Sequence, residues 1–372
     1  MPDVFTKVTT KSYGKRLTES VGGVVLGVAL FFGSFGMLYW NEGRVDLSDV
    51  AKKAEITASS TVDATKNGHF VSISGKVLGS EDIGDGLFLK PGAYLSVQRT
   101  AEVYAWVEDE ETKTETNTGG SETNTTTYTY KKEWVALADD SSQFQYPEGH
   151  INSQNRTVQN ESTYAPTITL GAYAVNGTTV DLPSGTELSL TPALVTLPQG
   201  AALSGSYLYV KNADPASPEV GDERVSFTVL KEGFDGTAFG KAEGSEILSY
   251  TDEDGNTLFR IFTGGHAEAL TQLHGEYTFT LWLLRLIGFL MMWFGMQMVI
   301  GPLSTLLDIL PFLGGASRMV TGAITFVIAL ALSLVTIVIS AILHSILALI
   351  VVGLLVIGGV MFLKTRKKSL VS

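Results

Sequence analysis

The sequence predicts a multi-pass α-helical membrane protein with four transmembrane helices and one large β-rich α+β extramembrane domain. Two observations predict this class. Long uncharged apolar runs lie near both ends of the 372-residue chain, and the acidic middle alternates apolar with polar residues. A bilayer core needs about 20 apolar residues in a helix, whereas alternation is typical of strands with one buried face. The uneven division of hydrophobicity excludes a single soluble globule.

The first element is a basic tail, residues 1–19, followed by a transmembrane helix over 20–40. A cleaved signal peptide is the competing interpretation, because the tail carries four Lys or Arg residues. The apolar run is too long for a usual signal sequence. It also ends in Tyr39 and Trp40 rather than in small residues suited to cleavage. We therefore expect an uncleaved span whose aromatic residues lie at the membrane interface.

Three further spans are expected in the last hundred residues. The apolar run 319–363 would be about 68 Å long as one helix, roughly twice a bilayer, so it must fold back near 340–345. A shorter apolar stretch interrupted by proline and glycine is expected to be an interfacial loop. The predicted boundaries are 278–301 for the second span, 302–318 for the loop, 319–341 and 344–363 for the third and fourth spans, and 364–372 for a basic tail.

The orientation follows from the two basic tails, which four spans place on the same side. The positive-inside rule predicts that this side is cytoplasmic. The middle domain would then be periplasmic in a bacterium, or lumenal in an endomembrane system. Residues 45–277 hold 34 acidic and 15 basic residues, a balance of −19. Such a domain disfavours nucleic acid as a partner.

The extramembrane domain, residues 41–277, is expected to consist mainly of strands. The stretch 95–108 alternates cleanly, 127–137 is a candidate partner strand, and the Thr- and Glu-rich residues between them predict a mobile hairpin tip. Two short helices are expected at the edges of the domain. They are 47–56, with Ser48 as N-cap, and 266–277, which leads into the second span.

The strongest candidate metal ligands are His266, Glu268 and His274. A helix would separate the two histidines by two turns, which is poor geometry for a shared ion. Solvated residues on a juxtamembrane helix are the favoured interpretation. The chain has no cysteine, and the carboxylates of 108–111 indicate a solvated loop. We expect no cofactor and no enzymatic activity.

Arg285 is the one charge well inside a predicted span. It lies within snorkelling range of the outer edge, so it can anchor to lipid headgroups or form a salt bridge with Glu42 or the underside of the domain. The sequence favours neither interpretation over the other. Gly23 and Gly27 form a small-residue face that allows close helix packing, within the chain or between copies.

Several stretches together resemble the transmembrane protein 43 (LUMA) family, in the same order along nearly the whole chain. Ser153 departs from the family pattern, which has proline after Asn152, and this affects a local turn. The matching stretches are Glu19-x-x-Gly22-Gly23, Asn41-Glu42-Gly43-Arg44, Glu102-x-Tyr104-x-Trp106-Val107-Glu108, Tyr128-x-Tyr130-x-x-x-Trp134, Gly149-His150-x-Asn152, Pro215-x-x-Pro218-Glu219-Val220-Gly221-Asp222-x-Arg224-Val225-Ser226-Phe227 and Trp282-x-Leu284-Arg285.

The resemblance implies a four-span membrane protein with one large extramembrane domain and no enzyme activity. Animal members of this family are similar to inner nuclear membrane and endoplasmic reticulum proteins that self-associate and organise membrane complexes with emerin and lamins. Those partners presuppose a nucleus, whereas the Thr- and Asn-rich style of this chain favours a bacterial member. The candidate interaction residues are Asn41, Glu42, Gly43, Arg44, Trp106, Trp134, Pro218, Gly221, Asp222, Arg224, Trp282 and Arg285.

These motif residues also have a physical interpretation as docking features. Gly43 can relieve the turn that leaves the first span, and Glu42 and Arg44 can pair with the base of the domain. Residues 218–222 can form a turn that aims the following strand, and Trp282 can anchor the second span at the interface.

The preferred function is a non-enzymatic membrane scaffold that assembles with itself, with other membrane proteins and with the lipid bilayer. Two alternatives stay open. One is a metal-dependent enzyme or sensor that uses the juxtamembrane His and Glu residues. The other is a channel or transporter, which the small number of polar groups in the spans disfavours.

Overall fold

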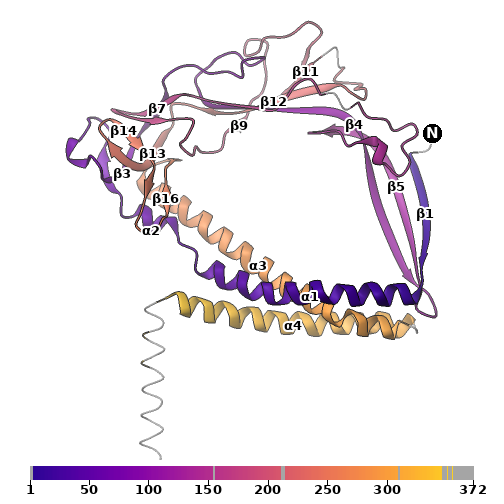
Figure 1. Ribbon diagram of the computed structural model, residues 1–372. Coiled ribbons are helices and arrows are strands. Elements are labelled where there is room, and N and C mark those ends of the chain that lie inside the picture. The colour runs from indigo at the N-terminus through magenta and orange to yellow at the C-terminus, as the bar shows by residue number, and fades with distance from the viewer. Residues whose placement is uncertain are drawn as a thin grey trace, which may run out of the picture. The chain divides into compact units, whose positions relative to one another are not determined.

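The computed structural model describes residues 3–153, 156–210, 214–308, 311–345, 350 and 354. The chain divides into two compact units (Figure 1). The β-rich unit comprises Met1–Lys7, Asp46–Glu111 and Thr126–Gly275, and the helical unit comprises Val8–Val45, Thr112–Thr125 and Glu276–Ser372. The strands β1, β4 and β5 and the helix α3 each have residues in both units.

The described strands are β1 (Val4–Lys11), β2 (Glu55–Ala58), β3 (Phe70–Gly79), β4 (Tyr94–Thr116), β5 (Glu122–Val135), β6 (Glu161–Tyr164), β7 (Thr167–Leu170), β8 (Tyr173–Asn176), β9 (Thr186–Glu187), β10 (Ala202–Ser204), β11 (Tyr207–Val210), β12 (Glu223–Lys231), β13 (Asp235–Glu243), β14 (Glu246–Leu248), β15 (Tyr250–Thr251), β16 (Thr257–Leu258) and β17 (Arg260–Thr263). One sheet has the order β1-β5-β4-β12-β11-β10, with β6 beside β4 and β9 beside β12. A second has the order β17-β13-β14-β8-β7-β3-β2, with β13 also beside β3, and β15 pairs with β16 alone. This large β content confirms the β-rich domain that the sequence predicts.

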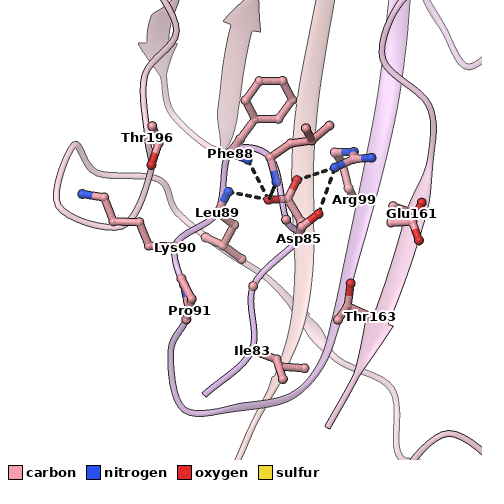
Figure 2. A pocket seen from close by; sticks show the side chains of 13 residues that line it. Ile83, Asp85, Phe88, Leu89, Lys90, Pro91, Arg99, Glu161, Thr163 and Thr196 are labelled. Atoms are coloured by element: carbon pink, nitrogen blue, oxygen red, sulfur yellow. Dashed lines mark hydrogen bonds and ion pairs between the residues drawn. The ribbon is translucent and has the colours of Figure 1, made fainter. Parts of the chain in front are cut away.

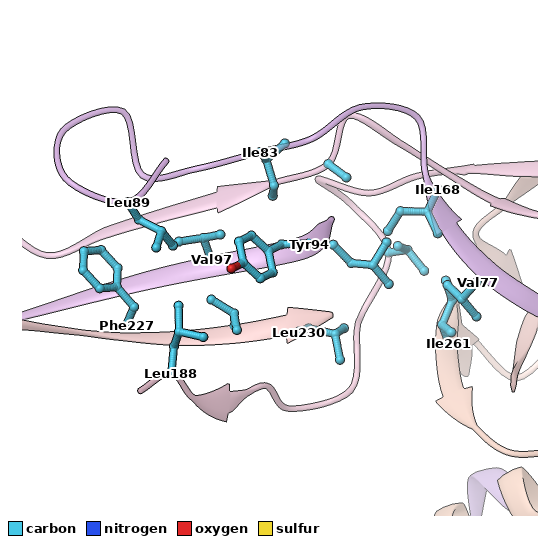
Figure 3. Packing of buried hydrophobic residues seen from close by; sticks show 14 of the residues in the cluster. Val77, Ile83, Leu89, Tyr94, Val97, Ile168, Leu188, Phe227, Leu230 and Ile261 are labelled. Atoms are coloured by element: carbon cyan, nitrogen blue, oxygen red, sulfur yellow. The ribbon is translucent and has the colours of Figure 1, made fainter. Parts of the chain in front are cut away.

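The core of the β-rich unit is one apolar cluster with residues from strands of both sheets. The predicted alternation of β4 is confirmed, because Val97 and Ala101 are buried while Gln98 and Thr100 are exposed. β4 pairs antiparallel with β12, and Phe227 of that strand is fully buried. Figure 3 shows side chains from both sheets in one continuous apolar cluster. Burial at about 25 cal/mol per Å² of apolar surface makes this cluster the main source of the unit's stability.

The predicted hairpin is present, but most of the stretch expected as its tip is strand, because the two strands continue almost to the turn. β4 runs to Thr116 and β5 starts at Glu122. The Thr-rich sequence explains this, since β-branched residues favour extended backbone. Gly119 and Gly120 have positive φ angles of 89° and 82°, which a turn of this kind requires. The acidic residues 108–111 are consequently strand residues rather than loop residues, and 109–111 are exposed as expected.

The described part of the basic tail predicted at residues 1–19 is also structured. It contains β1 and the first turns of the helix α1 (Tyr13–Glu42). Alternating valine and threonine residues favour the strand. Ser12 follows the strand and caps the helix α1. Its side chain accepts a hydrogen bond from the backbone N–H of Lys15.

Three described helices are long and apolar enough to cross a membrane, and this supports an integral membrane protein. They lie in α1, α3 (His266–Leu307) and α4 (Pro311–His344). The structure differs from the predicted loop 302–318, since residues 302–307 continue α3 and residues from 311 onward belong to α4. Proline at the first position of a helix is favoured, which explains the start of α4. That helix ends inside the predicted turn 340–345.

The fourth predicted span, 344–363, and the tail 364–372 lie outside the described residues except for Ile350 and Leu354. Four transmembrane helices therefore stay a prediction.

Glycines allow α1 and α3 to pack closely within the helical unit. A Cβ atom on Gly27 would lie 2.8 Å from the carbonyl oxygen of Gly295, and one on Gly295 would lie 2.7 Å from the backbone nitrogen of Phe31. Of the small-residue face predicted from Gly23 and Gly27, Gly27 therefore packs against α3. Gly23 does not, because a Cβ atom on it would meet no described atom within 4 Å.

Replacing Gly27 by alanine is expected to destabilise the helical unit by about 1–3 kcal/mol, because the added methyl group forces the two backbones apart. The matched control is Gly23→Ala, which gains the same helix propensity without a clash and is expected to be neutral or slightly stabilising. Thermal unfolding in mild detergent measures the difference. Equal melting temperatures for the two variants would contradict the packing described here.

Candidate functional site

The first group of candidate residues forms a joint at the end of α1, inside the helical unit. We call it the joint cluster and define it as Asn41, Glu42, Gly43, Arg44, Trp282 and Arg285. Asn41 is completely buried, and its Nδ2 donates a hydrogen bond of 3.0 Å to the carbonyl oxygen of Leu281 on α3. This bond ties the last turn of α1 to the neighbouring helix.

The centre of the joint cluster is a two-point ion pair between Glu42 and Arg285. Nε of the arginine lies 2.8 Å from Oε1 of the glutamate, and Nη2 lies 2.7 Å from Oε2. The side chains are only 5% and 19% exposed, so water screens the pair weakly. The guanidinium carbon also lies 4.7 Å from the ring centre of Trp282. Of the two roles left open for Arg285, the structure contains the salt bridge to Glu42.

Gly43 and Arg44 complete the joint cluster. A Cβ atom on Gly43 would lie 2.5 Å from Nε2 of His344, so the missing side chain makes room for the end of α4. The guanidinium of Arg44 lies about 6 Å from the ring centres of Trp40 and Tyr277, which is within cation–π range. Arg44 thus contacts aromatic rings of the helical unit.

The second group lies in the β-rich unit, on the outer face of the first sheet. We call it the aromatic ladder and define it as Tyr104, Trp106, Trp134, Tyr207, Tyr209 and Arg224. The guanidinium carbon of Arg224 lies 3.8 Å from the ring centre of Tyr207 and 4.5 Å from that of Trp134. Nε of Arg224 also pairs with Oε2 of Glu102 at 2.7 Å. The ladder joins four strands across one face, because its rings come from β4, β5 and β11 and its cation from β12.

A turn fixes the register of the strand that carries Arg224. Gly221 has φ of +99°, a conformation that glycine adopts readily, and its N–H donates to the carbonyl of Tyr104 at 2.9 Å. The N–H of Tyr104 donates in return to the carbonyl of Asp222 at 2.8 Å. The Asp222 carboxylate accepts from the N–H of Glu219, the residue after Pro218, at 2.8 Å. The structure therefore places these residues in the turn that aims β12.

Trp106 connects the ladder to the loop that follows β5. Its backbone N–H donates to Oδ1 of Asn152 at 2.7 Å, and Nδ2 of Asn152 donates back to its carbonyl at 2.8 Å. The indole ring packs edge-on against the buried His150 at 4.8 Å, and Nζ of Lys132 lies 4.8 Å from its centre. Both loop residues belong to the Gly-His-x-Asn stretch of the sequence.

The comparisons with known proteins agree with these motifs. The family described as Transmembrane protein 43 matches residues 103–346. The chain belongs to this family. It is similar to Transmembrane protein 43 of Mus musculus, with 25% identity covering 97% of this chain and 94% of the relative. The Homo sapiens protein is 26% identical, covering 89% and 87%, and a Drosophila melanogaster homolog is 26% identical, covering 73% and 74%. No solved structure matches the chain significantly.

The alternative metal site is not assembled in this member of the transmembrane protein 43 family. Nδ1 of His266 lies 2.7 Å from the hydroxyl of Ser72, whereas Nδ1 of His274 lies 2.6 Å from Oδ2 of Asp46. Glu268 is exposed. Among the described residues there is no group of three or more potential ligands placed to hold a metal ion.

Asp46 has a further role as the cap of α2 (Leu47–Ala51), where the sequence predicts Ser48 as the N-cap. Its carboxylate accepts a hydrogen bond of 2.8 Å from the backbone N–H of Ser48. Burial by itself would raise the pKa of Asp46, but the hydrogen bonds from His274 and Ser48 outweigh it and hold that pKa below its ordinary value.

Sequence reasoning missed a buried charge cluster in the helical unit. Nη2 of Arg16 on α1 lies 2.5 Å from Oδ2 of Asp308 at the end of α3 and 2.7 Å from Oε1 of Glu122 at the hairpin tip. Nη1 donates to the carbonyl of Gly120 at 2.5 Å. The side chains of Arg16 and Asp308 are 7% and 1% exposed. An isolated acid after a long apolar helix is the only signal in the sequence that could have indicated this cluster.

A second missed ion pair lies beside a cavity of about 620 Å³ in the β-rich unit (Figure 2). Oδ2 of Asp85 pairs with Nη1 of Arg99 at 2.5 Å, and Oδ1 accepts from the N–H groups of Phe88 and Leu89 at 2.7 and 2.6 Å. Both side chains are almost completely buried. Because these groups satisfy one another, the pair acts as a clamp that holds the loop between β3 and β4 against the sheet.

Replacing Arg224 by alanine is expected to destabilise the β-rich unit by about 1–2 kcal/mol, because two cation–π contacts and a partly buried ion pair are lost together. Lys131→Ala is the matched control, since this lysine pairs with Asp109 on the surface and is expected to change stability by less than about 0.5 kcal/mol. Chemical unfolding followed by tryptophan fluorescence measures both. Equal effects would show that the ladder contributes nothing beyond an ordinary surface charge.

Proposed function

We propose that this protein is a non-enzymatic membrane scaffold that self-associates and assembles other membrane proteins into complexes. The observation that carries the proposal is that the charged and aromatic residues of the family motifs engage one another. Glu42 holds Arg285, and Arg224 packs against Trp134 and Tyr207. Side chains that pair and pack with one another stabilise the folded structure. A catalytic centre instead needs convergent groups that stay available to a substrate.

The face of α1 that is not used within the chain supports self-association. A Cβ atom on Gly22 or Gly36 would meet no described atom within 4 Å, in contrast to Gly27. Fourteen residues of helix bring Gly22 and Gly36 to within about 40° of each other around the axis, so they lie on one face. Small residues let two helix backbones approach closely in lipid, where dispersion and interhelical hydrogen bonds drive association. A second copy of this chain or the helix of another membrane protein fits such a face.

The proposed cellular location follows from the charge of the β-rich domain and from the family. The β-rich domain, with its balance of −19 over 45–277, would be exposed to the periplasm from the cytoplasmic membrane of a bacterium. In a eukaryote the corresponding location is the inner nuclear membrane or the endoplasmic reticulum. Nucleic acid is not a proposed partner, because an acidic surface repels phosphates.

Co-purification of two differently tagged copies tests self-association. Both copies are expressed in one cell, the membranes are solubilised in mild detergent, one tag is captured and the other is detected. We expect the second tag in the captured fraction. Cells that express each copy separately and are mixed after solubilisation serve as the control and should give none. Recovery no greater than in this mixed control would contradict the proposal.

A further inference from the structure

We propose that Arg44, held by the rings of Trp40 and Tyr277 in the helical unit, binds the phosphate group of a phospholipid. We call this group of three residues the phosphate site. The inference goes beyond the proposed scaffold function and does not depend on self-association. It assigns to Arg44 the headgroup contact that the sequence left open for Arg285.

Arg44 is a half-buried cation that lacks a polar partner in the described part of the chain. No carboxylate oxygen of a described residue lies within 4.0 Å of its guanidinium. Its Nη1 is buried and donates no hydrogen bond to a described residue. Glu42, two positions earlier, is not available, because both of its carboxylate oxygens accept from Arg285 at 2.8 and 2.7 Å. An unpaired guanidinium that is partly removed from water needs an anion.

Two aromatic rings hold this guanidinium in place. Its central carbon lies 5.9 Å from the ring centre of Trp40 and 6.0 Å from that of Tyr277. Nη1 is the only buried nitrogen of the group, so Nε and Nη2 stay accessible to a ligand. Planar N–H groups of this kind match two oxygens of a phosphate. Because the rings already restrict the side chain, binding costs less conformational freedom.

The phosphate site lies where phospholipid headgroups are expected. The helix α1 is long and apolar enough to cross a membrane, and Arg44 follows its last residue by two positions. Trp40 is 60% exposed, and Trp282, beside the Glu42–Arg285 pair, is 63% exposed. Exposed tryptophans at the end of a span are typical of the membrane interface. Phosphate is the anionic group that every phospholipid presents at this depth.

A free phosphate ion offers the same oxygen atoms as a phospholipid headgroup. The exposed ring of Trp40 favours the lipid, because it adds an apolar surface beside the cation that the glycerol and the upper acyl chains can cover. A free ion gains nothing from such a surface. The experiment therefore separates the two sources.

Native mass spectrometry of the delipidated full-length protein in detergent tests the site with phosphatidylethanolamine as the probe. We expect Arg44→Gln to weaken lipid binding about tenfold, since charge-assisted hydrogen bonds to the phosphate are lost. Lys15→Gln is the matched control, because it removes one exposed cation from the same helix, and we expect it to have little effect. An equal effect of the two substitutions would overturn the proposal.

Two further probes identify the ligand. A galactosyl diacylglycerol with the same acyl chains carries no net charge, like phosphatidylethanolamine, but has no phosphate. We expect its binding to be independent of Arg44, and dependence on Arg44 would show that phosphate is not the group recognised. Inorganic phosphate at millimolar concentration is expected to leave the bound phospholipid in place. Displacement of the lipid would assign the site to a free ion and overturn the proposed source.

Thermal unfolding distinguishes binding from a structural role of Arg44. Added phosphatidylethanolamine is expected to raise the melting temperature of the unsubstituted protein, because a ligand that binds only the folded state stabilises it. The rise should be smaller for Arg44→Gln and intermediate for Arg44→Lys, which keeps the charge but not the planar group. If Arg44→Gln melts at a lower temperature without lipid but gains as much from the lipid as the unsubstituted protein, Arg44 is structural and the proposal is wrong.

Discussion

Replacing Arg16 by methionine is expected to lower the free energy of unfolding of the helical unit by about 3–5 kcal/mol. Asp308 and Glu122 both contact the same nitrogen, Nη2, so the substitution removes the cation that lies between two carboxylates. Asp308 is almost completely buried, and a carboxylate held in low dielectric without that cation is strongly disfavoured. Chemical unfolding in detergent, followed by circular dichroism, measures the loss.

A second substitution distinguishes the charge from the packing. Adding Asp308→Asn to Arg16→Met removes one of the two repelling carboxylates and is expected to restore a large part of the loss. Lys11→Met is the control, because Lys11 pairs with Glu19 on the exposed surface and should cost less than about 0.5 kcal/mol. A double variant no more stable than Arg16→Met would contradict the electrostatic explanation.

Replacing Glu42 by methionine is expected to destabilise the joint cluster by about 3 kcal/mol, the second largest effect. The substitution leaves the Arg285 guanidinium, 19% exposed, without the carboxylate that accepts two of its hydrogen bonds. The contact with Trp282 is retained but is worth about 1 kcal/mol, so it cannot compensate. Thermal unfolding in detergent, with tryptophan fluorescence as the readout, measures the change.

Two further variants give this prediction its control. Glu42→Met/Arg285→Met replaces both charges by apolar side chains of similar length and is expected to recover most of the stability. Arg285→Lys keeps the charge but cannot form the two-point contact, and an intermediate loss is expected. If Glu42→Met alone leaves stability unchanged, the glutamate does not hold the arginine in the membrane protein.

The strands of the β-rich unit were predictable wherever one face of a strand is buried. Val97 and Ala101 lie on the inward face of β4 because the side chains of a strand alternate with a period of two. The hairpin tip was not predictable from its polarity. Threonine combines a polar group with a strong preference for extended backbone, and the second property decided the structure.

The candidate site was predictable where the sequence already held a family motif. Glu42 and Arg285 were recognisable as a possible pair because Arg285 is the one charge well inside a predicted span and Glu42 is the first charge after the preceding span. Arg16 was read as one basic residue among four, since its partners lie more than 100 positions away in the chain, in the β4–β5 hairpin and just after α3. Contacts of this kind depend on the tertiary fold and leave no local periodicity.

The most direct test of the proposed function is a count of the copies in each particle extracted from native membranes. Chains that carry one fluorescent tag each are expressed at near-native levels, extracted with their lipids into nanodiscs, and bleached one molecule at a time. A membrane protein known to be monomeric gives the labelling efficiency and the background. The account predicts two or more bleaching steps in most particles. A distribution identical to that of the monomeric control would contradict self-association and, with it, the assignment of this protein as a scaffold.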